Sequence, residues 1–403
     1  MCLIDKCNQL FKESCLAAFP AVEIDPSFYP ALDLEHGDIA SRLPQVIGEQ
    51  LRIDAASAGE ELLKRLKGVV SQACLKDNFI NVRFERHELV EEVFSGYSSG
   101  NSNESLPHEH IIVLPPPHHG LSGLAYIRLC SAALLQKVLL KRAGASVGLR
   151  MLCFDKEIDA FAPKELLAFL LRIVEERSFS PAEVSREFTQ QLQNRGANDA
   201  QLHVWLSTRS LSKRDFKGIV GAKLKLFAHT PEMTWLMPWS ESALVDFRAS
   251  LAESGALLFH LMRPLPALEL DLSACRLPEN SNLFWLVRNT QLRLNRIFPE
   301  GSSKEGSVQS PTQEFEPWSL VRRVLLRHRF FEWFEMRAAY YGEVRQYFAA
   351  IEDLLIAANC YMNAPDYRRR AAQRLLSRRE IEFVTGIEDR ISDIINLSNL
   401  LTI

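Results

Sequence analysis

The chain has 403 residues and carries 47 basic against 50 acidic side chains, a net charge of −3. A chain longer than about 250–300 residues usually builds more than one hydrophobic core, so we expect two or three domains. The charge balance excludes a protein that coats nucleic acid with a uniformly basic surface, although it allows a local basic patch. No run of the sequence approaches the ~20 apolar residues of a membrane-spanning helix, which excludes that class as well.

The N-terminal residues and the cysteines indicate a cytoplasmic protein. The first residues, MCLIDKCNQLFKES, contain Asp5 and Glu13 and no long apolar stretch, which argues against a secretory signal or a transit peptide. The cysteines are scattered and form no CxxC pair, so a zinc ribbon is not indicated and we expect no metal site. In a chain of this length we expect them to be reduced core thiols.

Two segments have the composition of linkers. Both Ser95–Pro107 and Gly301–Gln313 are rich in small polar residues and poor in apolar anchors, so they cannot bury enough surface to fix one conformation. With the motifs described below, they divide the chain into three expected domains, residues 1–94, 108–272 and 273–403.

The N-terminal segment mixes helix and strand patterns, and the C-terminal segment is helical. Ala58–Val70 has apolar residues at helical spacing, whereas Asn78–Phe84 alternates with the period of a strand. Trp318–Asn359 and Asp366–Leu400 have the pattern of long amphipathic helices, broken near Pro365. We therefore expect an α+β domain at the N-terminus and a helical bundle at the C-terminus.

The central segment begins with the pattern of one βαβ unit. His110–Leu114 is a short apolar run of the kind found in buried strands, and Val147–Phe154 is a second strand candidate. Between them, Leu124–Ala143 predicts a long helix that ends at Gly144, a plausible C-terminal cap. Strand, helix and strand in this order predict an α/β domain.

Charge is unevenly distributed along the chain. Residues 1–63 contain 11 acidic and 4 basic side chains, net −7, whereas residues 318–379 contain 12 arginines, no lysine and 6 acidic side chains, net +6. Arginine both binds phosphate through its planar fork and stacks on bases. Such a stretch is either a solvated helix face or an RNA-binding module, and the sequence leaves both interpretations open.

Two motifs of the N-terminal segment resemble the N-terminal additional domain of arginyl-tRNA synthetases. That domain has an HGD signature early and a GFIN signature late; here His36-Gly37-Asp38 is intact, and FIN (79–81) follows Asn78 in place of the glycine. The resemblance implies contact with the tRNA elbow, Phe79 by stacking and Asn81 by hydrogen bonds to a base edge. The alternative is that Phe79 belongs to the core and Asn81 caps a turn.

A second group of motifs resembles the block that leads into the anticodon-binding domain of the same family. Ala256-Leu257, Glu269–Leu272 and Asn282–Val287 follow in the family's order, although Leu258, Arg288 and Gln291 replace its arginine, glutamine and histidine. The C-terminal helices, with Arg374-Leu375, then resemble the helical DALR anticodon-binding domain. The resemblance implies contacts to tRNA, which we assign to five arginines: Arg293, Arg368, Arg369, Arg370 and Arg374.

The catalytic motifs of that family are degenerate. The family's HIGH motif falls at Gly123–Tyr126 if the sequences are aligned on the end of the predicted helix. It falls at His118-His119-Gly120-Leu121 if they are aligned on matching letters. In either alignment the last histidine of the motif is replaced, by Tyr126 or by Leu121. The alternative for His118 and His119 is a pair of exposed loop histidines.

The candidate for the family's second catalytic motif, KMSKS, is Ser212-Lys213-Arg214, which keeps only the second half of that motif. The alternative interpretation of these three residues is a solvated turn. Residues 155–202 leave less room than the family's insertion needs. ATP binding is implied only by the resemblance.

No other catalytic motif is present, and several histidines are interpreted as isolated structural residues: His87, His203, His229, His260 and His328. We therefore expect an arginyl-tRNA synthetase-like protein with a shortened Rossmann-like core that binds tRNA and does not aminoacylate it. One alternative is an active enzyme, either a divergent arginine–tRNA ligase or one that transfers arginine to another acceptor. Another is a helical scaffold whose aromatic helices, Phe330–Phe348, bind a partner protein.

Overall fold

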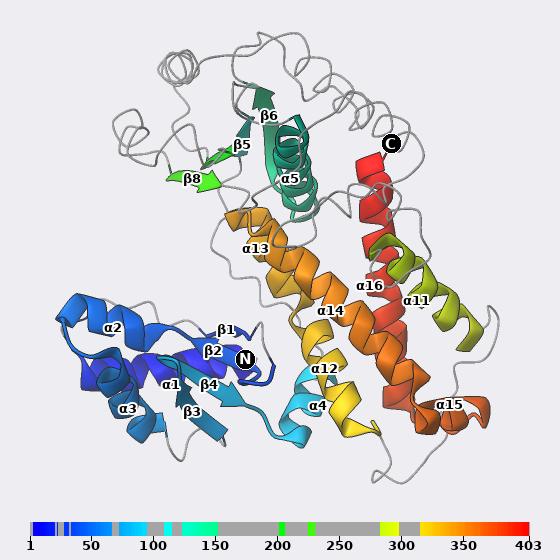
Figure 1. The fold of residues 1–403 in the computed structure, drawn as a ribbon, viewed down its shortest axis with the longest axis horizontal. Coiled ribbons are helices and arrows are strands. Elements are labelled where there is room, and N and C mark those ends of the chain that lie inside the picture. The colour runs from blue at the N-terminus through cyan, green and yellow to red at the C-terminus, as the bar shows by residue number, and fades with distance from the viewer. Residues whose placement is uncertain are drawn as a thin grey trace. The chain divides into compact units, whose positions relative to one another are not determined.

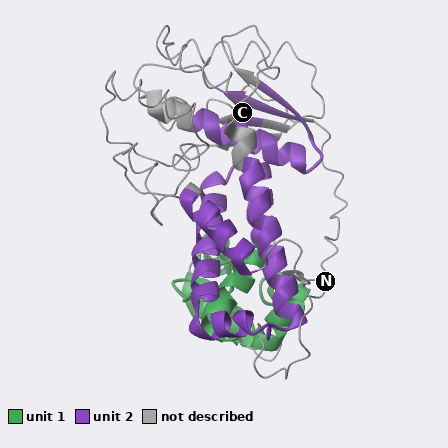
Figure 2. Cartoon of the chain, turned by 90° about the vertical axis from the view of Figure 1, so that its right-hand side faces the viewer, with its two compact units in different colours: residues 1–104, 315–330 green, residues 105–314, 331–403 purple. Residues whose placement is uncertain are grey.

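The chain divides into two compact units, residues 1–104 with 315–330 and residues 105–314 with 331–403 (Figure 2). The structure is a computed structural model and describes residues 3–20, 22, 28–31, 34–66, 72–94, 109–114, 123–151, 201–205, 225–229, 283–297 and 315–402. Both expected linkers lie outside these residues, and the division into three domains stays a prediction.

The first unit contains a four-stranded antiparallel sheet with the order β1-β2-β4-β3. Its strands are β1 (Tyr29–Pro30), β2 (Ile39–Ser41), β3 (Gln72–Lys76) and β4 (Phe79–Arg83). The turn between β3 and β4 consists of Asp77 and Asn78, which both have positive φ, 51° and 62°. A two-residue hairpin turn needs this geometry, and asparagine and aspartate tolerate it better than most residues. Asn78 therefore fills the place of the family's glycine.

The same unit contains several helices (Figure 1). They are α1 (Leu3–Ala18), α2 (Leu43–Leu51), α3 (Ala55–Leu66), α4 (Arg86–Phe94) and, from much later in the chain, α12 (Trp318–Arg329). Of these, α2 and α3 pack against the sheet. The helix predicted at Ala58–Val70 is present as α3, and its last four predicted residues lie outside the described part of the chain. Leu62 and Leu66 of α3 are buried, as the apolar spacing predicts.

Arginines fix α12 to the rest of the first unit. Arg322 forms a salt bridge with the fully buried Asp38, and Arg329 Nη2 lies 2.6 Å from Glu92 Oε1. Arg327 donates to the backbone carbonyl of Ala31 at 2.9 Å. These contacts explain why a segment of the C-terminal half belongs to the N-terminal unit, which the sequence patterns did not indicate.

The HGD motif supports these contacts. Asp38 also accepts a 2.7 Å hydrogen bond from the backbone N–H of Phe84 at the end of β4. A Cβ at Gly37 would lie 3.0 Å from the carbonyl oxygen of Val82, so the close approach to β4 favours glycine there. Burial raises the pKa of Asp38, while the charge of Arg322 and the Phe84 amide act in the opposite direction. The motif therefore holds the sheet and α12 together.

The second unit contains a parallel sheet with the order β6-β5-β7-β8. Its strands are β5 (Glu109–Leu114), β6 (Ser146–Met151), β7 (Gln201–Trp205) and β8 (Lys225–His229). With α5 (Gly123–Arg142), β5 and β6 form the predicted βαβ unit. The helix ends at Gly144, which has φ +85° and donates to Lys141 O at 3.0 Å, so the predicted glycine cap is confirmed.

The C-terminal part of this unit is helical throughout its described residues (Figure 1). Its helices are α11 (Leu283–Ile297), α13 (Phe331–Tyr341), α14 (Val344–Asn363), α15 (Pro365–Ala372) and α16 (Arg378–Thr402). The predicted helix 318–359 is interrupted at Phe330 and at Gly342, where Gly342 has φ +67°. Pro365 begins α15, which confirms the predicted break. Within the described residues, no helix is both long and apolar enough to span a bilayer.

We expect Asp38→Ala to destabilise the first unit strongly. The change leaves the charge of Arg322 without its partner and the Phe84 amide without its acceptor, and breaking a buried pair typically costs about 3–5 kcal/mol. Glu61→Ala on α3 is the control, because its ion pair with Arg65 is exposed and contributes only about 0.3–0.5 kcal/mol. Urea unfolding followed by hydrogen exchange at the β4 amides measures both. Equal losses in the two variants would contradict this role of Asp38.

Candidate nucleic-acid interface

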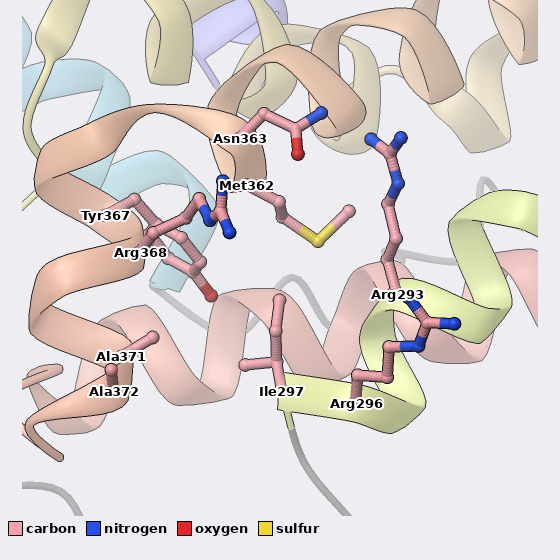
Figure 3. A pocket seen from close by; sticks show the side chains of 9 residues that line it. All are labelled: Arg293, Arg296, Ile297, Met362, Asn363, Tyr367, Arg368, Ala371 and Ala372. Atoms are coloured by element: carbon pink, nitrogen blue, oxygen red, sulfur yellow. The ribbon is translucent and has the colours of Figure 1, made fainter.

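A pocket of about 430 Å³ lies between α11, α14 and α15 of the second unit (Figure 3). Three of the residues that line it are arginines, and the described lining contains no carboxylate. Its walls also contain apolar side chains and a tyrosine. The lining residues are Arg293, Arg296, Ile297, Met362, Asn363, Tyr367, Arg368, Ala371 and Ala372.

A buried polar network positions Arg293 on α11. Its Nη1 donates to Asn359 Oδ1 of α14 at 2.8 Å. The Nδ2 of Asn359 donates in turn to Thr290 Oγ1 at 2.5 Å and to the Leu355 carbonyl at 2.9 Å. Asn359 and Thr290 are buried, so the guanidinium of Arg293 is held at the pocket wall by groups that cannot easily move.

A second network orients α15 and, with it, Tyr367 and Arg368. Arg370 Nη1 lies 2.6 and 2.7 Å from the two carboxylate oxygens of Glu380. Glu380 also accepts from the backbone N–H of Ser377 at 3.0 Å, while its own N–H donates to Ser377 Oγ at 3.0 Å. This reciprocal pair is a capping box at the start of α16. Arg370 thus ties α15 to the N-terminus of α16.

The pocket combines positive charge with apolar surface. Arginine binds phosphate oxygens through paired N–H groups, and the pocket offers three guanidinium groups. Ile297 and Met362 supply apolar surface beside these groups. The volume lies in the range of small-ligand sites. The arrangement suits one unpaired nucleotide of an RNA strand better than a purely apolar ligand.

The structure brings together only some of the predicted arginines. Arg293 and Arg368 line the pocket, and Arg296, which sequence analysis did not select, joins them. Arg369 and Arg374 are exposed outside the lining. Arg370 is buried, and its partner is Glu380. Arg296 could have been found from the sequence, because it lies three residues after Arg293 on one helix and so near the same face.

The predicted elbow contacts lie on β4 of the first unit. Phe79 is half-buried, while Asn81 is buried and donates from Nδ2 to the Phe79 carbonyl at 3.2 Å. Asn81 is also paired in the sheet with Ala40 and Cys74 on either side. Phe79 therefore has the more accessible side chain of the two.

The parallel sheet has a topological switch point. The chain runs from β5 to β6 on one side and β7 lies on the other, so the order reverses between β5 and β7. Ligands of open α/β sheets bind at such a switch point, outside the carboxyl ends of the strands. His118 and His119 follow β5 in sequence, and Ser212, Lys213 and Arg214 follow β7, but all five lie outside the described residues. Tyr126 falls in the first turn of α5.

The structure also shows a buried histidine pair that sequence analysis missed. His203 was interpreted as isolated, which is wrong: its Nε2 lies 3.0 Å from Nδ1 of His110, and both rings are fully buried. Gln136 Nε2 donates to the Ala339 carbonyl at 2.9 Å and lies 3.1 Å from His203 Nδ1. Because a carbonyl only accepts, the amide orientation is fixed; His203 then donates from Nε2 to His110, and His110 carries its own proton on Nε2. The network joins β5, β7, α5 and α13.

The aromatic side chains that a protein scaffold would need at its surface are largely internal. Phe331 and Phe334 of α13 and Tyr347 and Phe348 of α14 are almost fully buried, and so is Phe330. Phe331 and Tyr347 pack with ring centroids 5.5 Å apart. These rings form the core of the helical part.

Comparisons with solved structures agree with the motifs. The structure is similar to the crystal structure of arginyl-tRNA synthetase from Plasmodium falciparum, with a TM-score of 0.57 over 100% of this chain and 98% of that one at 9% identity. It is also similar to Thermus thermophilus arginyl-tRNA synthetase, with a TM-score of 0.55 over 98% of both chains at 10% identity. The fold is arginyl-tRNA synthetase-like. No family model matches the sequence, and no curated protein matches it either.

The histidine pair makes a prediction about pH. Burial lowers the pKa of His110 from its ordinary value of 6.5. His110 therefore takes up a proton more readily in the unfolded chain than in the folded protein. Above pH 6.5 it is neutral in both states and does not reduce the free energy of unfolding. As the pH falls from 6.5 toward the lowered pKa of the folded state, the free energy of unfolding decreases. Melting temperatures measured between pH 7.5 and 5 should show this loss. His110→Gln keeps an acceptor for His203 and cannot titrate, so its melting temperature should depend less on pH; an unchanged dependence would contradict the assignment.

Proposed function

We propose that this protein binds tRNA through its arginyl-tRNA synthetase-like fold and does not aminoacylate it. The observation that carries the proposal is the pocket between α11, α14 and α15, which is lined by three arginines and has no carboxylate in the described lining. The likeness in fold favours tRNA over other RNAs as the partner. We place this activity in the cytoplasm, in keeping with the scattered cysteines.

Exposed arginines extend the charge beyond the pocket. Arg369 and Arg374 follow Arg368 in the chain and are exposed, so they can contact backbone phosphates next to a nucleotide held in the pocket. Arg370 serves the fold in its ion pair with Glu380. The proposed interface therefore consists of Arg293, Arg296, Arg368, Arg369 and Arg374.

A second contact is proposed on the N-terminal unit. Phe79 is half-buried on β4 and offers part of its ring for stacking on a base. Asn81 is buried beside it and bonded to the Phe79 carbonyl, so we assign it the role of positioning that strand. This contact rests on the family resemblance of the motifs at residues 36–38 and 79–81.

Reversing the charge of Arg296 or Arg368 should weaken tRNA binding by about tenfold or more, since a charge-assisted hydrogen bond contributes about 1.5–3 kcal/mol. Each lost phosphate contact should also reduce the slope of log affinity against log salt by about 1, because fewer counterions are released. Filter binding or fluorescence anisotropy over a salt series measures both quantities for Arg296→Glu and Arg368→Glu.

Arg378→Glu is the matched control for that experiment. Its side chain is 86% exposed on α16, outside the pocket, and the substitution changes net charge by the same amount. We expect a small effect on affinity. If Arg378→Glu weakens binding as much as the pocket variants do, the pocket is not the interface; if the wild-type protein does not bind tRNA at low salt, the proposed function is wrong.

An active arginine–tRNA ligase is the second candidate, and the parallel sheet with its switch point between β5 and β7 favours it. In that case ATP would bind at the carboxyl ends of these strands. The sequence argues against catalysis, because either alignment of HIGH lacks the last histidine and the candidate at 212–214 lacks the first lysine of KMSKS. Each lost donor to a developing charge typically reduces the rate by about 10²–10³-fold.

We therefore expect no arginine-dependent pyrophosphate exchange, with or without added tRNA. The measurement compares the wild-type protein, Lys213→Ala and a reaction without protein. Exchange by the wild-type protein that Lys213→Ala abolishes would overturn the inactive assignment and establish the ligase instead.

A further inference from the structure

Tyr367 presents a polar atom that the fold does not use. Its side chain is fully buried, and its hydroxyl has no hydrogen-bond partner among the described residues. Burying a hydroxyl without a partner destabilises a protein, so such groups are few in folded chains and call for an explanation. Tyr367 also lines the arginine pocket, and its hydroxyl points from α15 toward the space in front of Ile297 (Figure 3).

The neighbouring Tyr361 shows what a structural tyrosine does in the same surroundings. The two rings pack with centroids 4.6 Å apart. Tyr361 donates to Glu380 Oε1 at 3.2 Å, so its hydroxyl is satisfied inside the fold. Glu380 is also engaged by Arg370 and by the Ser377 amide. Of the two tyrosines, only the one at the pocket wall lacks a partner in the described structure.

Arg368 is the exposed neighbour of Tyr367 at the pocket wall. It follows Tyr367 in sequence, and both residues line the pocket (Figure 3). The hydroxyl has almost no exposed surface, so a ligand atom that reaches it must displace a neighbouring side chain. A long exposed side chain such as that of Arg368 moves at low cost, and a phosphate bound to its guanidinium would hold it away from the pocket wall.

We propose that the Tyr367 hydroxyl is the specificity-determining contact of this pocket and donates a hydrogen bond to an acceptor on the base edge of an unpaired nucleotide. The proposal rests on the proposed RNA-binding function and adds the group that discriminates between bases. The three arginines supply charge, which any nucleotide satisfies, whereas a neutral donor fixed in position recognises one pattern of acceptors. Burial raises the pKa of Tyr367, so the hydroxyl keeps its proton and remains a donor at neutral pH.

The test is Tyr367→Phe, measured on tRNA and on short single-stranded RNAs of each homopolymer. Loss of one neutral hydrogen bond should lower affinity about three- to tenfold for tRNA and for the homopolymer whose base the pocket prefers. The other homopolymers and an abasic oligonucleotide should bind as tightly to the variant as to the wild type. The salt dependence should stay unchanged, because no phosphate contact is lost.

Stability separates this role from a structural one. Tyr367→Phe removes a buried hydroxyl without a partner, so the melting temperature of the free protein should stay the same or rise. Tyr361→Phe is the matched control: it breaks a bond to Glu380, so the melting temperature should fall while RNA selectivity is kept.

Three results would overturn the proposal. The first is that Tyr367→Phe binds every RNA as tightly as the wild type does. In that case the proposed function would still stand if Arg296→Glu and Arg368→Glu weaken binding. An equal loss on the abasic oligonucleotide would place the contact on the sugar-phosphate backbone. If the melting temperature of Tyr367→Phe falls as much as that of Tyr361→Phe and RNA selectivity does not change, the Tyr367 hydroxyl has a structural role.

Discussion

The position of helix α15, and of the pocket beside it, depends on the buried ion pair between Arg370 and Glu380. Both side chains are almost completely removed from water, at 7% and 1% exposure, so each charge needs the other. Helix α15 has only 8 residues and buries few side chains besides Tyr367 and Arg370. Since so short a helix has little apolar area of its own, its position follows from this pair. The ion pair therefore also positions one wall of the pocket, because Tyr367 and Arg368 lie on the same helix.

Arginine serves two purposes in this chain, and a count of charges does not separate them. Residues 318–379 contain twelve arginines, and most of them bind groups of the protein itself. Arg322, Arg327, Arg329, Arg337 and Arg370 bind such groups from buried or half-buried positions, whereas the ion pairs of Arg369 and Arg378 are exposed. Arg293 and Arg296 of the pocket come from α11, before this stretch begins. Part of the positive charge of this stretch is therefore used inside the fold, so the number of arginines does not by itself measure the interface.

Short sequence patterns correctly predicted the helices, strands and caps that depend on interactions between residues close together in the chain. The strand, helix and strand around α5 and the cap at Gly144 follow from apolar spacing and from the conformational freedom of glycine. The capping box Ser377–Glu380 was equally local and could have been found. The pair of His110 and His203 could not, because it joins residues 93 positions apart. Sequence analysis treats Arg368 and Arg370 as one group of tRNA contacts. Each residue of an α-helix turns the chain by about 100°, so the two side chains lie on different sides of α15, where Arg368 is exposed and Arg370 is buried.

The place of α12 also determines the order in which the chain can fold during synthesis. The first unit is made of residues 1–104 and 315–330, so the ribosome makes all four strands of its sheet long before it makes α12, the helix that completes the unit. Until then Asp38, which accepts a hydrogen bond from the Phe84 amide after β4, lacks Arg322, the cation that compensates its charge. Domains generally fold as units in the order of their synthesis, but here the N-terminal unit must wait for the whole intervening chain. A fragment that ends before residue 315 would carry the N-terminal sheet and lack the helix that neutralises its buried carboxylate.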